Sequence, residues 1–113
     1  MASYKVFVCG PIIGNINAVE DFAKAEEVLQ NYNSSWKATS PLDLGVPISK
    51  ENQERLIRRC MDAVLASDAL FLLRGWNRSS IFKSVYKMAK EMGLPIYEFD
   101  EYIEEFELIE AAG

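Results

Sequence analysis

The segment R-G-W-N-R-S-S, residues 74–80, gathers side chains that could hold an anionic ligand. Its two arginines could pair with a phosphate or a carboxylate through charge-assisted hydrogen bonds, and its glycine lets a ligand approach the backbone closely. The tryptophan could stack on a base or cover a sugar, and the two serines stand at a helix start, where the helix dipole favours negative charge. The candidate ligand-binding residues here are Arg74, Gly75, Trp76, Arg78, Ser79 and Ser80. In the alternative interpretation, the tryptophan packs under the loop and both arginines pair with surface acids.

A second candidate loop lies in the segment V-F-V-C-G-P-I-I-G-N, residues 6–15, where a short apolar run ends at Gly10. Its candidate ligand-binding residues are Gly10, Pro11, Gly14 and Asn15. The spacing matches neither the dinucleotide fingerprint G-x-G-x-x-G nor a P-loop. The loop is therefore either a site where a ligand approaches the backbone or only a tight turn, and the residues alone leave both interpretations open.

The third candidate is S-P-L-D-L-G, residues 40–45. Asp43 could accept hydrogen bonds from ribose hydroxyls and is therefore included among the candidate binding residues. The alternative, which we favour from the residues alone, is that Ser40 and Asp43 hold the turn together.

Strand-like and helix-like segments alternate along the chain. The pattern predicts strands at 4–9, 36–39, in the segment A-L-F-L-L-R-G-W after Asp68, and at 95–99. It also predicts four helices, capped by Asn17, by Ser49, by Ser79 or Ser80, and by Asp100. Continuous apolar strands that alternate with helices indicate an α/β fold, here a Rossmann-like (flavodoxin-like) three-layer sandwich. We expect a four-stranded parallel sheet of order 2-1-3-4 with helices on both faces. Loops 10–17 and 74–80 then meet at the carboxyl ends of the strands, where ligands of such sheets bind.

Composition excludes several classes of chemistry. The chain of 113 residues contains no histidine, which rules out Ser-His-Asp and Cys-His nucleophile pairs and histidine-ligated metals. Cys9 and Cys60 form no zinc-like or disulfide-like pattern, and we interpret both as small buried hydrophobes. We expect one domain over residues 1–113, with no metal and no cofactor. No apolar run is long enough to cross a bilayer and no targeting segment is visible, so we expect a cytoplasmic protein with no membrane partner.

Charge is unevenly distributed. Residues 98–113 contain seven acids and no base, which leaves 17 − 7 = 10 acids against 12 bases in residues 1–97. Nine of these bases lie between Lys50 and Lys90. A balance of about +2 is too small for a nucleic-acid platform and is compatible with a local anion site.

Four segments together resemble the nucleoside 2-deoxyribosyltransferase-like family, in particular its small phage and bacterial branch. They are V-F-V-C-G-P-I-I-G-N, S-P-L-D-L-G, R-R-C-M-D-A-V-L-A-S-D-A-L-F-L-L-R-G-W and M-G-L-P-I-Y, in family order and spacing from Val6 to Phe99. The resemblance implies a Rossmann-like domain that binds a nucleoside or nucleotide. It also implies a homo-oligomer in which a neighbouring subunit completes the site.

In that family a glutamate attacks the anomeric carbon of the sugar and an aspartate helps to protonate the departing base. The resemblance puts Val85 at the glutamate position and Cys60 at the aspartate position. Neither side chain can perform that chemistry, and Glu91, a turn and a half further along the helix, is the fallback acid.

The sequence therefore predicts a protein that binds a nucleotide-like ligand without cleaving its glycosidic bond, to sequester or sense it. One alternative is a diverged nucleoside deoxyribosyltransferase or nucleotide N-glycosidase that uses Asp43, Asp62 or Glu91, with Tyr86 as a possible proton donor. A second alternative is an oligomeric interaction protein with no small ligand.

Overall fold

The computed structural model describes residues 4–12, 14–47 and 49–110. The strands and α-helices, in chain order, are β1 (Tyr4–Cys9), α1 (Ala18–Tyr32), β2 (Trp36–Thr39), α2 (Gln53–Leu65), β3 (Ala69–Leu72), α3 (Ser80–Glu91), β4 (Ile96–Asp100) and β5 (Glu105–Glu110). Three single-turn 3₁₀ helices complete the described chain: η1 (Pro41–Asp43), η2 (Lys50–Asn52) and η3 (Trp76–Arg78).

One mostly parallel sheet of five strands forms the centre of the fold, in the order β2-β1-β3-β4-β5. The four parallel strands lie in the order β2-β1-β3-β4, and β5 adds to β4 in the antiparallel direction. The expectation of a purely parallel four-stranded sheet is therefore wrong, and so is the helix expected after Asp100. In E-F-E-L-I-E, Phe106 and Leu108 alternate with glutamates and pair with Phe99 and Tyr97 of β4. This alternation is typical of a strand at the edge of a sheet.

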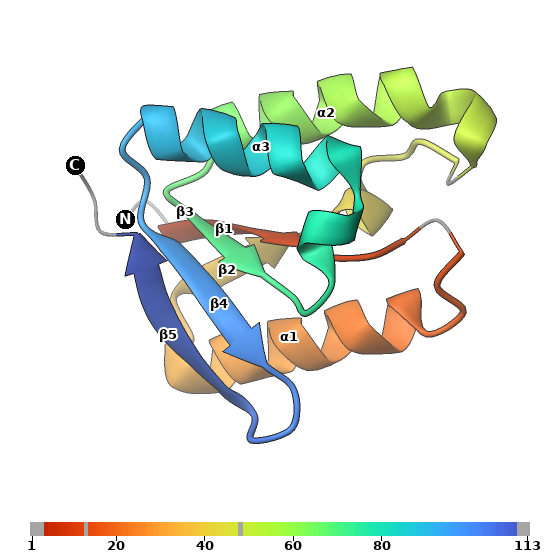
Figure 1. Cartoon of the computed structure of the whole chain (residues 1–113). Helices are drawn as coiled ribbons and strands as arrows, with labels where there is room; N and C mark the ends of the chain where they lie inside the picture. The colour runs from red at the N-terminus through yellow and green to blue at the C-terminus, as the bar shows by residue number, and fades with distance from the viewer. Residues whose placement is uncertain (1–3, 13, 48, 111–113) are drawn as a thin grey trace.

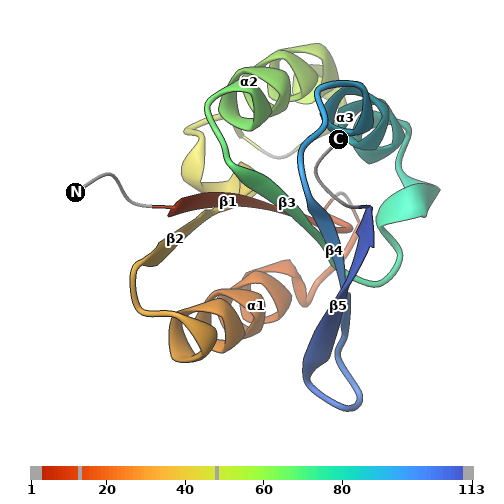
Figure 2. The same ribbon diagram turned by 90° about the vertical axis from the view of Figure 1, so that its left-hand side faces the viewer.

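Helices cover both faces of the sheet. Helix α1 lies on one face, and α2 and α3 lie side by side on the other (Figures 1 and 2). The central strand β3 is buried along its whole length, and so is β1 from Val6 to Cys9. Coverage on both faces explains why these strands are apolar runs rather than alternating patterns.

The apolar core accounts for the two cysteines as well. Cys9 and Cys60 are free thiols with no exposed surface, which confirms their interpretation as small buried hydrophobes. Burial raises the pKa of the Cys60 thiol to about 12 and raises that of Cys9 well above its usual range. Both thiols therefore stay protonated and unreactive at neutral pH.

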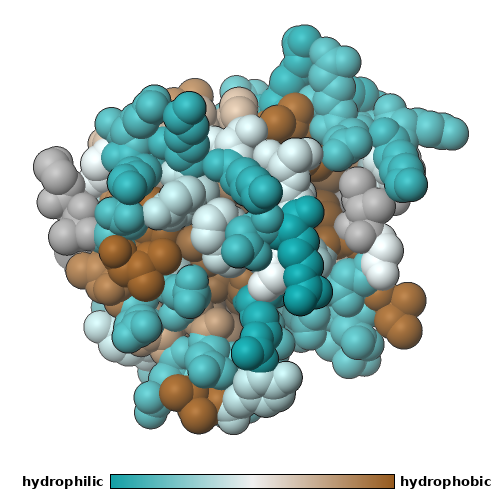
Figure 3. Space-filling model, in the orientation of Figure 1, coloured by the Kyte–Doolittle hydropathy of each residue, from teal (hydrophilic) through white to brown (hydrophobic). Residues whose placement is uncertain are grey.

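The loops after β1 and β3 begin at the same end of the sheet, where the parallel strands have their carboxyl ends (Figure 1). Helix α3 begins at Ser80 with Ser79 as its N-cap residue, as expected. Helix α2 begins at Gln53 rather than directly after Ser49, because the single turn η2 comes between them. The face of the molecule seen in Figure 3 is mainly hydrophilic, with apolar side chains scattered among polar ones.

Candidate functional site

The two loops predicted to meet at the carboxyl ends of the strands do lie against each other. The backbone N–H of Leu73 donates to the carbonyl oxygen of Cys9 at 2.7 Å, which joins the ends of β1 and β3. A Cβ atom at Gly10 would lie 2.8 Å from the Cβ of Leu73, and one at Gly75 would lie 3.0 Å from the Cγ of Pro11. Both glycines therefore allow the two loops to pack together.

A cavity of about 280 Å³ opens beside the first turn of α3. We call it the basic cavity, and its lining residues are Pro11, Ile12, Lys50, Gln53, Gly75, Arg78, Ser79, Ser80 and Ile81. Its lining includes two cations, one from the turn before α2 and one from the loop before α3, and no carboxylate from any described residue. Such a cavity favours an anionic group.

A neighbouring cavity of about 450 Å³ shares Pro11, Gly75 and Arg78 with the basic cavity. We call it the mixed cavity, and its lining residues are Pro11, Gly14, Asn15, Asp21, Arg74, Gly75, Arg78 and Glu101. It places two arginines and two carboxylates around one space. The structure thus brings together eight of the eleven predicted binding residues around the two cavities, with Gly10 just behind them.

Arg74 and Arg78 are exposed, and neither takes part in the three ion pairs found between described residues. The guanidinium of Arg74 lies over the ring of Tyr102, 4.5 Å from its centroid. The alternative interpretation, in which both arginines pair with surface acids, is therefore not met in the described part of the chain. Their charge remains available to a ligand.

Trp76 belongs to the same loop but packs differently. Its half-buried ring lies against Tyr86 of α3, with 4.9 Å between ring centroids. It lines a third cavity, of about 240 Å³, together with Arg74, Glu98 and Asp100. The indole thus packs against a side chain of α3 and also borders this third cavity.

Asn15 holds the first loop in shape. Its side-chain amide donates to the carbonyl oxygen of Pro11 at 2.9 Å and to Asp21 Oδ2 at 3.1 Å. Its Oδ1 accepts from the backbone N–H of Asn17 at 3.0 Å. These bonds place Asn15 and Asp21 together in the wall of the mixed cavity.

Asp43 lies outside both cavities, in the turn after β2. Its Oδ2 accepts from the backbone N–H of Ser40 at 2.9 Å and from the Ser40 hydroxyl at 3.3 Å. Ser40 Oγ in turn accepts from Leu42 N, so the pair forms a capping box around η1. This geometry agrees with the turn interpretation of Asp43.

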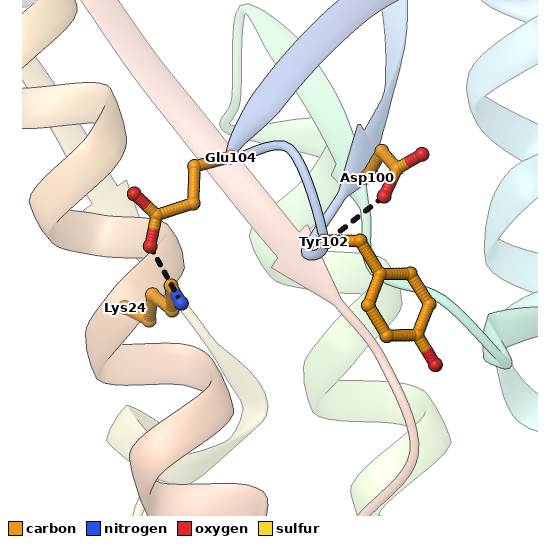
Figure 4. A network of polar contacts seen from close by, with 4 residues as sticks. All are labelled: Lys24, Asp100, Tyr102 and Glu104. Carbon is orange, nitrogen blue, oxygen red and sulfur yellow. Dashed lines mark hydrogen bonds and ion pairs between the residues drawn. The ribbon is translucent and has the colours of Figure 1, made fainter.

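Residues of the β4–β5 turn also reach the site, and sequence reasoning missed them because it expected a helix there. Glu101 lines the mixed cavity and Tyr102 contacts Arg74. The turn is held by a 2.9 Å bond from Tyr102 N to Asp100 Oδ1 and by a 2.7 Å ion pair between Lys24 and Glu104 (Figure 4). Lys50 and Gln53 were missed too, although the basic stretch from Lys50 onward was a signal for them.

The positions that the family resemblance links to catalysis lie inside the core. Val85 and Cys60 have no exposed surface, and neither lines the basic or the mixed cavity. Glu91 is the last residue of α3, roughly 16 Å along the helix axis from Ser80. Asp62 is an exposed residue of α2 and also lies outside both cavities.

Tyr86, the possible proton donor, is already engaged. Its hydroxyl donates to Glu110 Oε1 at 2.9 Å. Burial, followed by this bond, raises the pKa of the Tyr86 phenol. The same bond lowers the pKa of the Glu110 carboxyl, with further help from Lys90. Tyr86 therefore connects α3 to β5.

Within the described ranges, no group of three or more Cys, Asp or Glu side chains is arranged to hold a metal ion. No helix in the described part of the chain combines the length and hydropathy needed to span a membrane.

These features define an α/β protein with adjoining ligand-sized cavities at the carboxyl ends of its parallel strands. The chain belongs to the family described as Domain of unknown function (DUF4406), whose model matches residues 4–98. The fold is similar to the crystal structure of a conserved protein from Enterococcus faecalis V583, with a TM-score of 0.69 and 16% sequence identity. That similarity covers 92% of this chain and 68% of the other. The comparison with curated proteins gives no match.

Proposed function

We propose that this protein is a Rossmann-like domain that binds a nucleotide or nucleoside in the basic and mixed cavities and leaves its glycosidic bond intact. Such a protein sequesters or senses its ligand. The observation that carries the proposal is the basic cavity, which Lys50 and Arg78 both line and to which the described part of the chain contributes no carboxylate. A phosphate is the nucleotide group that fits this space.

The start of α3 adds neutral donors to the same cavity. The side chain of Ser79 makes no capping bond, so the first N–H groups of the helix keep their hydrogen-bonding capacity. Ser80 and Ile81, the first two residues of α3, line the cavity. Each hydrogen bond to a charged phosphate oxygen contributes roughly 1.5–3 kcal/mol, enough for micromolar affinity after the costs of association.

The arrangement of acids supports binding over cleavage. Retention of the family chemistry requires two carboxylates roughly 5 Å apart beside the glycosidic bond. At the two positions given by the resemblance stand Val85 and Cys60, both buried in the core. In the mixed cavity, the Asp21 carboxylate is already engaged within the protein, because its Oδ2 accepts a hydrogen bond from the Asn15 side chain.

Equilibrium dialysis against a panel of nucleoside 5′-monophosphates and the matching nucleosides tests the site. We expect Arg78→Ala to weaken nucleotide binding about tenfold to a hundredfold, the effect of losing a charge-assisted hydrogen bond. Binding of the nucleosides should change far less, because they lack the phosphate. The matched control is Arg59→Ala, an exposed arginine of α2 that lines neither cavity. Equal nucleotide affinities for the two variants would contradict this location of the site.

Light scattering of the same samples measures the oligomeric state. We propose that the protein is a homo-oligomer, as the family resemblance implies, and we therefore expect a mass of at least twice that of the 12.8 kDa chain.

A further inference from the structure

The mixed cavity differs from the basic cavity in the sign of the charges that line it. Arg74 and Arg78 face the same space as Asp21 and Glu101. None of the ion pairs within 4.0 Å found among the described residues joins these four groups. Cations and carboxylates therefore line one cavity without neutralising each other directly.

This combination restricts the chemistry of an occupant. The carboxylates disfavour an anionic group in the mixed cavity, and the arginines disfavour a cationic one. A neutral group that is rich in hydroxyls satisfies both kinds of residue, because a hydroxyl donates to carboxylates and accepts from guanidinium groups. The two cavities share Arg78, so this hydroxylated group lies next to the anion held in the basic cavity.

We propose that the mixed cavity holds the ribose of a ribonucleotide and that the Glu101 carboxylate accepts hydrogen bonds from the vicinal 2′- and 3′-hydroxyls. This inference rests on the proposed function and adds a sugar specificity to it. In a nucleotide the ribose is bonded directly to the phosphate, which matches the adjacency of the two cavities. The two oxygens of one carboxylate suit the two hydroxyl donors of a vicinal diol.

Glu101 is the better acceptor of the two acids. The Asp21 carboxylate already accepts from Asn15. Glu101 is half-buried, and its carboxylate makes no hydrogen bond with any other described residue. Its carboxylate therefore has its hydrogen-bonding capacity free for a ligand.

The turn that carries Glu101 is fixed from several sides, so its position is built into the fold. Asp100 accepts from the backbone N–H of Tyr102, Lys24 pairs with Glu104, and Arg74 lies over Tyr102 (Figure 4). These contacts join the turn to α1 on one side and to the loop after β3 on the other. Glu101 lies outside residues 4–98, which the family model matches, so this specificity belongs to the C-terminal hairpin of the chain.

Titration calorimetry with the four ribonucleoside 5′-monophosphates and their 2′-deoxy counterparts tests the inference. We expect the wild-type protein to bind its preferred ribonucleotide about tenfold to a hundredfold more tightly than the deoxy form, the effect of one hydrogen bond to a charged group. Glu101→Ala should remove this preference, because the ribonucleotide loses two hydrogen bonds to the carboxylate whereas the deoxyribonucleotide, which has only the 3′-hydroxyl, loses one. Glu101→Gln, which retains one acceptor oxygen, should keep an intermediate preference. The control Glu107→Ala, on exposed β5, should keep the wild-type ratio.

The affinity ratio is the informative quantity, because a purely structural effect of the substitution weakens both nucleotides together. Equal affinities of the wild-type protein for the two sugars overturn the inference and leave the proposed function in place. A preference that persists in Glu101→Ala overturns the role of Glu101. If neither class of nucleotide binds, the proposed function fails, and the inference fails with it.

Discussion

Gly75 joins the two loops of the candidate site at a point where a side chain meets two obstacles. Its φ of 85° lies in the left-handed region, where residues other than glycine are strained. In addition, a Cβ atom there would approach the Cγ of Pro11 to 3.0 Å. Gly14 has a similar φ of 79°, but a Cβ atom there would have nothing within 4 Å. The two glycines therefore separate the conformational cost from the cost of close packing.

We expect Gly75→Ala to lower the free energy of unfolding more than Gly14→Ala. The left-handed backbone alone costs about 1–2 kcal/mol for a residue with a Cβ atom, and Gly75→Ala adds the displacement of Pro11. Urea unfolding monitored by circular dichroism measures both values. Equal losses in the two variants would show that the loops do not pack as tightly as the contact between Gly75 and Pro11 implies.

Residue types in the sequence indicated which side chains could bind, but not which partners they already had. Arg78 was predicted to bind an anion, and it lines the basic cavity with no ion pair to any described residue. Trp76 was predicted for the same site, yet its ring packs against Tyr86 and it lines neither the basic nor the mixed cavity. Tyr86 lies ten residues further along the chain on α3, and nothing in the local pattern of the loop reveals that contact.

At the scale of elements, the prediction from sequence periodicity was wrong in the C-terminal hairpin, where it gave a helix in place of strand β5. Ile103, Phe106 and Ile109 fit the spacing of a helix face, and Phe106 and Leu108 fit the alternation of a strand. Short apolar segments are ambiguous in this way, and tertiary contacts decide between the two states. Here Phe106 completes an aromatic cluster with Tyr32, Phe71 and Tyr97, at centroid distances of 5.0, 5.2 and 5.6 Å. This cluster joins three strands of the sheet, β3, β4 and β5, to the end of α1.

We expect Phe106→Ala to destabilise the protein by about 2–3 kcal/mol, somewhat less than a fully buried phenylalanine because the ring is half-buried. The control is Ile109→Ala in the same strand, since Ile109 is 37% exposed and should cost less than about 1 kcal/mol. Thermal or urea unfolding of the two variants measures the difference. Similar losses in both would mean that β5 does not pack through Phe106.

The parallel strands were easier to predict from sequence, and β1 and β3 most of all, because burial on both faces makes them continuous apolar runs. Residues 4–9 and 36–39 were predicted as strands with the same bounds as β1 and β2. The predicted start of α2 was too early, because the turn η2 follows Ser49 and the α-helix begins only after it. A serine before a polar segment can precede a 3₁₀ helix as well as an α-helix. The loops at the site followed correctly from the strand order, whereas the contribution of Glu101 required the hairpin to be known.

At the scale of the whole molecule, the fold brings the basic middle of the chain and its acidic C-terminal segment to the same end of the sheet. Three of the basic residues between Lys50 and Lys90 line the cavities at the carboxyl ends of the parallel strands: Lys50, Arg74 and Arg78. The acidic segment after Glu98 folds back along the sheet edge as β5, and Glu101 reaches the same site. One end of the sheet thus combines the basic cavity with the mixed cavity. This combination is what the proposed ligand, a nucleotide, requires.

The central claim, binding without cleavage, is tested most directly by the fate of the ligand. The pure protein is incubated at near-stoichiometric concentration with a panel of nucleosides and nucleotides, the mixture is filtered, and the filtrate is analysed by chromatography. We predict that one intact compound is missing from the filtrate and is recovered when the protein is denatured. Release of free base into the filtrate would contradict the claim and establish an N-glycosidase or transferase, with Asp21 and Glu101 as the first acids to replace.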